Sequence, residues 1–345
     1  MSLKQRVALF FLVVFLPLAT IWFFQDKYIE LKGDVFGTTY VIKSFVPKWV
    51  SKEKIAYSLN NEFKRLDLIF STWNSDSEIS KFNAMDASAS MRITDDFSYV
   101  LEKSIEYYEH SSGYYDPTVK PLLSLWGFGG QSEFFNVPSR ANIKRALNNV
   151  GMAYIRLNKP YIKKEKASIQ LDLSSLAKGY AVDQVFDILY SLKATRFMVE
   201  IGGEVRVFTP STNKSWKIGI TNPRYGFSSN NLFAHVSLRQ GALASSGDYQ
   251  NYFKKGSKTY SHIINPKTGY PIDNKVASVT VYAPTCMQAD GLATMLMSLG
   301  VNRGLSILES MDDVEGVFIV RENEKEFKTY VSSGMAAIGY ASNRK

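Results

Sequence analysis

The fold is decided by residues 171–183, which have the sequence LDLSSLAKGYAVD. Residues 168–173 have the pattern of a strand, and apolar residues at helical spacing follow them, so a strand should lead directly into a helix. Ser174 or Ser175 is the expected N-cap of that helix. The free N–H groups and the dipole at a helix start attract anions, and Lys178 lies in the first turn. The junction is therefore a predicted phosphate site, although Lys178 alone fits a surface lysine equally well.

Helices and strands are mixed on both sides of this junction. Helical spacing and N-cap residues predict helices at 51–70, 94–112, 139–150 and 285–299. Apolar runs between Gly, Pro and Asn clusters predict strands at 35–46, 197–201, 216–220, 232–238 and 276–282, a hairpin at 316–331 and a loop at 71–83. The pattern lacks strict βαβ alternation, so the predicted fold class is α+β, with mixed, largely antiparallel sheets and packed helices.

The composition excludes some kinds of site. The chain has 345 residues, of which 45% are hydrophobic, so it can bury a full core without metals or disulfides. Cys286 is the only cysteine, which excludes an internal disulfide and a zinc or iron–sulfur centre built on several cysteines. The net charge of +9 permits attraction to nucleic acid, anionic lipid or a phosphorylated ligand. Because the lysines are scattered, a solvated basic surface is favoured over a nucleic-acid groove.

The N-terminus has the features of a membrane anchor. Lys4 and Arg6 precede residues 7–24, which are uncharged and largely apolar. At about 1.5 Å per residue this stretch spans about 27 Å, enough to cross a bilayer core. A small-x-small cleavage site and a lipid-accepting Cys are both missing, so an uncleaved signal anchor is favoured over a cleaved signal peptide. The predicted division is an anchor at 1–25 and one soluble domain at 26–345, on the far side of the membrane from the basic flank.

Two tyrosines form the first candidate ligand site. Tyr114 and Tyr115 precede an Asp116-Pro117 turn, and their rings could stack on a planar group while the turn supplies hydrogen bonds. An aromatic-rich turn packed on the core explains the same residues, and on the residues alone it is the favoured interpretation.

One of the three histidines is a candidate general base. His262 follows a predicted strand and precedes an Asn265-Pro266 turn, where a side chain can reach a cleft, and imidazole transfers protons near neutral pH. His110 and His235 fit ordinary positions on a helix and in a strand. If His262 were not the base, Asp248 would be the next candidate.

A pair of oxygen-bearing side chains forms a candidate metal site. Asp290 and Thr294 are four residues apart on a predicted helix, so their oxygens lie on one face. Two hard oxygen ligands suit Mg²⁺, which takes few protein ligands and completes its shell with water and phosphate. Such pairs are common on helix surfaces, so the metal interpretation depends on the neighbouring segments.

These segments, in this order, resemble the ApbE family of FAD:protein FMN transferases. The likeness begins at Gly37-Thr38-Thr39-Tyr40, continues through Phe70-Ser71-Thr72-Trp73 and residues 77–83, and ends near Gly300. Each motif is weak alone, but the ordered set is specific and covers most of the chain after residue 25.

The resemblance implies particular roles for residues of this chain. FAD contacts are expected at Phe36, Trp73, Tyr114, Tyr115, Asp116, Asp172, Lys178 and Ile264. The metal site is expected at Asp290 and Thr294, with oxygens from Ser175 and Ala293 nearby, and His262 at the position of the base. Three positions depart from the family pattern: Phe36 replaces Met, Ser245 replaces Thr, and Asn265 replaces Asp, which removes a carboxylate near His262.

The implied activity is Mg²⁺-dependent transfer of FMN from FAD to a Ser or Thr hydroxyl of another protein, with release of AMP. The implied acceptors are flavoprotein subunits of membrane redox complexes, such as Na⁺-pumping NADH:quinone reductases or Rnf-type complexes. The expected location is the bacterial inner membrane, with the catalytic domain in the periplasm. Two alternatives are a protein that only binds FAD and an FAD pyrophosphatase that yields FMN and AMP.

Overall fold

The structure is a computed structural model that describes residues 5, 25–87, 89–128, 135–210, 213–224, 231–256, 258–323 and 326–342. The expected anchor at 7–24 lies outside these residues. Within them, every helix is too short or too polar to span a bilayer.

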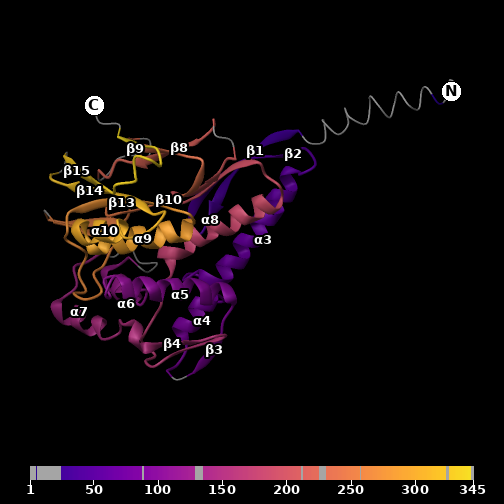
Figure 1. Cartoon of the computed structure of the whole chain (residues 1–345). Coiled ribbons are helices and arrows are strands. Elements are labelled where there is room, and N and C mark those ends of the chain that lie inside the picture. Colours follow the sequence, from indigo (N-terminus) through magenta and orange to yellow (C-terminus); the bar gives the residue numbers. More distant parts are fainter. Residues whose placement is uncertain are drawn as a thin grey trace.

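An antiparallel sheet forms the centre of the described chain, with the strand order β1-β2-β6-β7-β10-β13-β14-β15 (Figure 1). All of its pairings are antiparallel, as the α+β prediction requires. The strands are β1 (Asp26–Val35), β2 (Thr38–Pro47), β6 (Arg196–Ile201), β7 (Glu204–Phe208), β10 (Gln240–Gly247), β13 (Val276–Ala283), β14 (Glu315–Arg321) and β15 (Phe327–Val331).

Smaller sheets and helices surround this sheet. Three small sheets contain β8 (Trp216–Thr221), β9 (Leu232–Leu238) and β16 (Tyr340–Ser342); β11 (Tyr252–Lys255) and β12 (Lys258–Ser261); and β3 (Ser90–Arg92), β4 (Ile155–Asn158) and β5 (Tyr161–Lys164). The helices are α3 (Lys52–Phe70), α4 (Glu78–Ala84), α5 (Asp95–His110), α6 (Lys120–Trp126), α7 (Arg140–Leu147), α8 (Ser174–Ser191), α9 (Cys286–Leu299) and α10 (Val301–Leu308).

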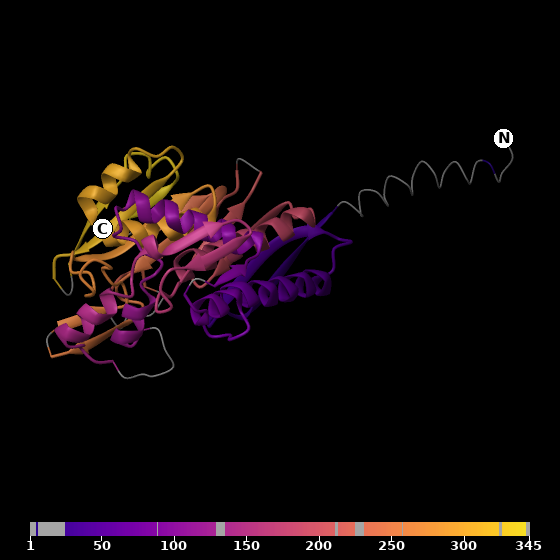
Figure 2. The same ribbon diagram turned by 90° about the horizontal axis from the view of Figure 1, so that it is seen from below.

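The central sheet is buried on both faces. Along β14, Phe318 packs into the core shared with α8 and α9, whereas Val317 and Ile319 pack into the core beneath β8 and β9. Successive side chains of a strand point to opposite faces, and here both faces are buried. The strand is therefore an almost continuous apolar run. Figure 1 shows α8 and α9 on one side of the sheet with α5 and α6 beyond them, and Figure 2 shows α3 alongside β1 and β2.

A close contact between α8 and α9 brings their N-terminal ends together. A Cβ at Gly179 would lie 2.5 Å from the carbonyl oxygen of Cys286, so glycine is needed for this approach. One turn further along α8, the buried carboxylate of Asp183 accepts the N–H groups of Cys286 and Met287, both at 2.9 Å. Asp183 also pairs with Arg206 of β7 at 2.8 Å. These contacts lock α8, α9 and the sheet into one register.

Asp183→Asn should therefore lower the free energy of unfolding by about 1–3 kcal/mol, because the amide cannot accept both N–H groups or neutralise Arg206. Urea denaturation monitored by far-UV circular dichroism measures this loss. Asp187→Asn, an exposed change on the same helix, is the control and should leave stability unchanged. Equal stability of the two variants would contradict the locking role.

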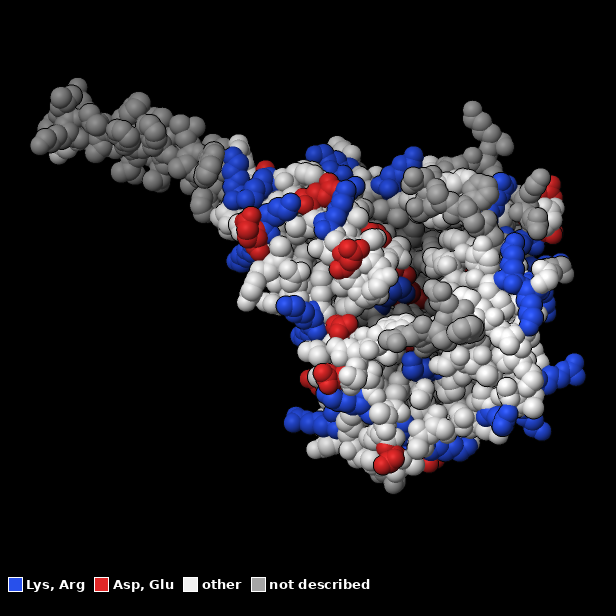
Figure 3. Space-filling model, turned by 180° about the vertical axis from the view of Figure 1, so that it is seen from behind, with Lys and Arg blue, Asp and Glu red and all other residues white. Residues whose placement is uncertain are grey.

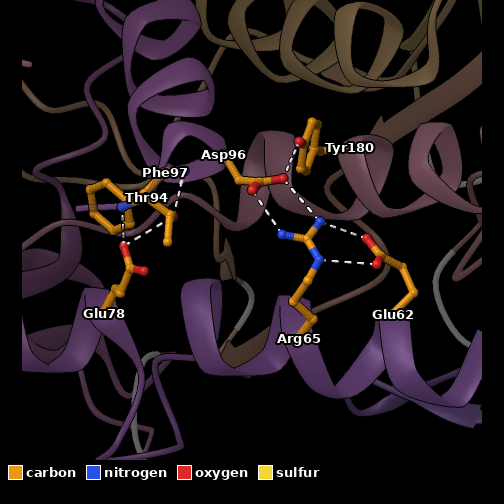
Figure 4. A network of polar contacts seen from close by, with 7 residues as sticks. All are labelled: Glu62, Arg65, Glu78, Thr94, Asp96, Phe97 and Tyr180. Carbon is orange, nitrogen blue, oxygen red and sulfur yellow. Dashed lines mark hydrogen bonds and ion pairs between the residues drawn. The ribbon is translucent and has the colours of Figure 1, made fainter. Parts of the chain in front are cut away.

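A second polar network joins the helices beneath α8 (Figure 4). Arg65 of α3 donates to Glu62 on its own helix and to both oxygens of Asp96 on α5. Tyr180 of α8 donates its hydroxyl to the same Asp96. The network fixes α3 and α5 against α8, whose first turn carries Lys178.

Most predicted elements are confirmed. Thr94, Ser139 and Thr285 are N-caps, as expected, and the strands at 216–220, 232–238 and 276–282 and the hairpin at 316–331 are present. The predicted loop at 71–83 is partly wrong, because Ser77 caps the short helix α4. The single strand at 35–46 is also wrong, since a turn at Phe36 and Gly37 joins β1 to β2.

The decisive junction at 171–183 differs in detail from the prediction. Ser168 lies in a turn, residues 169–173 form no strand, and α8 begins at Ser174 without a serine cap. Instead, Asp172 accepts the N–H of Ser174 at 2.9 Å, which makes a carboxylate the first acceptor at the helix start. Of the N–H groups predicted to be free, that of Ser174 is therefore occupied, and those of Leu176 and Ala177 are bonded to the carbonyl oxygen of Leu173.

Candidate active site

A cleft opens where the first turn of α8 meets α9 and β10. Lys178, Ser175, Asp290, Thr294 and His262 all line it, so predicted site residues that are far apart in the sequence converge. An adjoining cavity is lined by Phe36 and Trp73, and it shares Ser174 and Lys178 with the cleft. Lys178 thus lies between the cleft and the adjoining cavity, and each of these has an aromatic side chain in its lining. This arrangement suits an elongated ligand with a charged group at its centre.

Lys178 lies between two buried carboxylates. Its Nζ atom is 3.3 Å from Glu204 and 3.7 Å from Asp290. Burial disfavours the ammonium form, but the two carboxylates outweigh it and raise the pKa of Lys178 above its usual value. Burial likewise raises the pKa of Asp290, and that of Glu204 to about 8, against the opposing effect of Lys178. The lysine therefore remains cationic at neutral pH.

The predicted metal ligands lie together beside this cluster. Asp290 is 3% exposed and accepts the N–H of Gly179 at 2.9 Å. Thr294 follows one turn later and bonds Ser246 at 3.0 Å between hydroxyl oxygens. Ser175 bonds the hydroxyl of Tyr115 at 2.8 Å, and Ala293 is buried in α9 next to Thr294.

These donors fit a hard divalent cation. A carboxylate and several hydroxyl oxygens border a cleft that would hold phosphate, which is the donor set that Mg²⁺ prefers. One Glu204 oxygen is buried without a hydrogen-bond partner among the described residues, so this carboxyl group has unused acceptor capacity. Among those residues, groups of three or more His, Cys, Asp or Glu side chains that could hold a metal ion do not occur.

A model of the ApbE family matches residues 36–318 of this chain. The chain belongs to the ApbE family. Curated relatives named FAD:protein FMN transferase come from Haemophilus influenzae, 36% identical over 90% of this chain and 91% of the relative, and from Vibrio cholerae, 36% identical over 88% and 91%.

Solved structures of the ApbE family have the same fold. The flavin transferase ApbE from Vibrio cholerae is 33% identical and superposes with a TM-score of 0.82. The match covers 91% of this chain and 99% of that one. The flavinyl transferase ApbE of Pseudomonas stutzeri is 33% identical with a TM-score of 0.81, over 98% of that chain and 92% of this one. The α+β architecture with antiparallel sheets is therefore the ApbE fold.

In this ApbE family member, His262 has the protonation state of a base. Its Nδ1 atom lies 3.0 Å from the carbonyl oxygen of Asn251, which can only accept, so Nδ1 carries the proton and Nε2 keeps its lone pair. Burial lowers the pKa of the imidazole below its usual value, which favours the neutral form at pH 7. The side-chain oxygen of Asn265 accepts the N–H of Lys267 at 2.9 Å.

Asp248 is not brought to the cleft. Its carboxylate pairs with Arg321 at 2.8 Å, and it is not among the residues that line the cleft. The fallback role as base is therefore unsupported by the geometry.

The two tyrosines of the predicted aromatic platform both line the cleft but lie differently in it. Tyr114 lines the cleft and has the Lys267 ammonium 4.4 Å from its ring centre. The ring of Tyr115 is buried edge-on against Tyr107, so Tyr115 supplies a hydroxyl to Ser175 rather than a stacking face.

Asp116, Asp172 and Ile264 also line the cleft. Asp116 accepts the N–H and hydroxyl of Thr118, Asp172 caps α8, and the backbone of Ile264 pairs with Pro271.

Sequence reasoning missed Glu204 and Ser246. Glu204 follows the Gly202-Gly203 turn at the start of β7, where both glycines have positive φ. An acidic residue directly after such a turn was the available signal, because the turn leaves the next side chain at the end of the sheet. Ser246 lies on β10 and has no comparable local signal.

Proposed function

We propose that this chain is a membrane-anchored, Mg²⁺-dependent FAD:protein FMN transferase of the periplasm. It transfers FMN from FAD to a Ser or Thr hydroxyl of a partner flavoprotein. The observation that carries the proposal is the convergence of Lys178, Asp290 and His262 on one cleft in a member of the ApbE family. A protein that only stored FAD would need neither the carboxylate site nor a neutral histidine beside it.

The geometry supports different roles for His262 and Lys178 in the cleft. In the reaction the acceptor oxygen bonds to the FMN phosphorus, the pyrophosphate P–O bond breaks, and AMP leaves. The Nε2 atom of His262 takes the proton of the acceptor hydroxyl. Lys178 neutralises charge on the pyrophosphate, and Phe36 and Trp73 border the space for one ring system of FAD.

Asp290 and Thr294, with oxygens of Ser175 and Ala293, would hold the Mg²⁺ ion. When bound there, Mg²⁺ neutralises the charge that develops on the pyrophosphate oxygens.

The start of the first strand supports a position next to the membrane for this end of the domain. Asp26 begins β1 directly after residues 7–24 and Gln25, and the backbone N–H of Lys48 bonds Gln25 at 3.1 Å. Trp49 is 45% exposed at this end, and Figure 3 shows Lys and Arg side chains there. Exposed Trp side chains are typical of the membrane–water interface on either side of a bilayer. The acceptors would be flavoprotein subunits of membrane redox complexes, of the Na⁺-pumping NADH:quinone reductase or Rnf type.

The activity test is incubation of the protein with FAD, Mg²⁺ and an acceptor subunit, followed by flavin fluorescence on a denaturing gel and AMP measurement. Labelled acceptor and AMP in equal amounts are expected. AMP without labelled acceptor would instead indicate an FAD pyrophosphatase, and bound FAD without AMP would indicate a binding protein.

Deletion of residues 1–24 should release the protein from membranes without loss of transfer, because every proposed site residue lies after residue 25. The measurement is the distribution between membrane and soluble fractions, with FMN transfer assayed in each. Retention of the truncated protein on membranes, or an inactive soluble form that still binds FAD, would contradict the anchor.

A further inference from the structure

Glu204 is a buried carboxyl group that has no role in the proposed mechanism. It is 4% exposed, lines the cleft, and has one oxygen without a partner among the described residues. Its other oxygen contacts Lys178 at 3.3 Å, within hydrogen-bond distance. Burial of a carboxyl group with one oxygen left without a partner costs free energy, so Glu204 calls for a role at this site.

The contacts of Lys178 are unequal. The Asp290 contact, at 3.7 Å, is longer than a hydrogen bond and involves the same oxygen, Oδ2, that accepts the N–H of Gly179. The Asp290 contact is therefore the weaker of the two, and the carboxylate stays anchored to α8 if the ammonium leaves it.

Lys178 also has space to move. It lines both the cleft and the adjoining cavity of Phe36 and Trp73, and its side chain is 33% exposed. Its long side chain can turn about Glu204 from Asp290 toward a phosphate without a change in backbone.

We propose that Lys178 is an exchangeable counter-cation: a divalent cation at Asp290 competes with it, and Glu204 retains the displaced ammonium in the cleft. Glu204 is thus a positioning residue that acts through Lys178. The idea rests on the metal site proposed at Asp290. It goes beyond that site because it makes metal binding and lysine placement one coupled step.

The test is Mg²⁺ affinity of the full-length protein without FAD, measured by calorimetry. Lys178→Met should bind Mg²⁺ at least about tenfold more tightly than wild type, because the competing charge is gone. Lys178→Gln repeats the test if the Met variant does not fold. Lys144→Met, an exposed change on α7, is the control and should match wild type. Unchanged or weaker binding by both Lys178 variants would overturn the exchange.

A double-mutant cycle isolates Glu204. Glu204→Gln alone should weaken Mg²⁺ binding, because Lys178 then pairs with Asp290 only, whereas Glu204→Gln added to Lys178→Met should have little further effect. Equal weakening in both backgrounds would make Glu204 a metal ligand and overturn its positioning role. Asp290→Asn tests the metal site separately from the exchange of Lys178. If this variant kept wild-type Mg²⁺ affinity, the metal site itself would be misplaced.

Discussion

His262→Ala is expected to slow FMN transfer by about 10²–10⁴-fold while FAD affinity stays nearly unchanged. The reason is that Nε2 holds the free lone pair, whereas Lys178 and the walls of the cleft are the proposed FAD contacts. Single-turnover transfer, with FAD affinity measured separately, distinguishes the two effects.

The pH dependence gives the same hypothesis a second readout. Burial lowers the pKa of His262, so the wild-type rate should fall only when the pH drops below the usual range for histidine and the base becomes protonated. In the variant the rate should no longer show this fall at low pH. It should recover partly at high pH, where more of the acceptor hydroxyl is ionised and a base is less necessary. His110→Ala, exposed at the end of α5, is the control. Loss of FAD binding with an unchanged chemical step would make His262 a ligand contact.

Asp290→Ala is expected to abolish Mg²⁺-dependent transfer, with a loss of at least about 10³-fold, because charge neutralisation by a metal contributes several kcal/mol. Asp290 also accepts the N–H of Gly179, so the alanine change affects the contact between α8 and α9. Asp290→Asn retains an acceptor for that N–H and should be equally inactive. Turnover against Mg²⁺ concentration and the melting temperature are the two measurements.

The control for both variants is Asp312→Asn, an exposed carboxylate after α10. It should leave turnover and melting temperature unchanged. A folded Asp290→Asn protein with near-normal Mg²⁺-dependent turnover would show that the metal lies elsewhere.

Local chemistry explains why so many elements were predictable. Ser51, Thr94 and Thr285 each accept an N–H of the following turn, a contact within four residues that the sequence displays directly. The strand at 168–173 failed for the opposite reason. Its alternation is real, with Ile169, Leu171 and Leu173 fully buried, but pairing requires a neighbouring edge that sequence pattern cannot place.

The sequence by itself determined the fold class, the helix starts and the identity of Lys178, Asp290, Thr294 and His262 as candidate site residues. Only the tertiary structure decided which of them meet. The contact of Glu204 with Lys178 was found only there, because it depends on how closely α8 packs against α9 and the sheet. That approach is set by the missing side chain of Gly179 and the carboxylate of Asp183, whose contacts join segments far apart in the chain. Periodicity records which face of an element is buried, but not which distant element covers it.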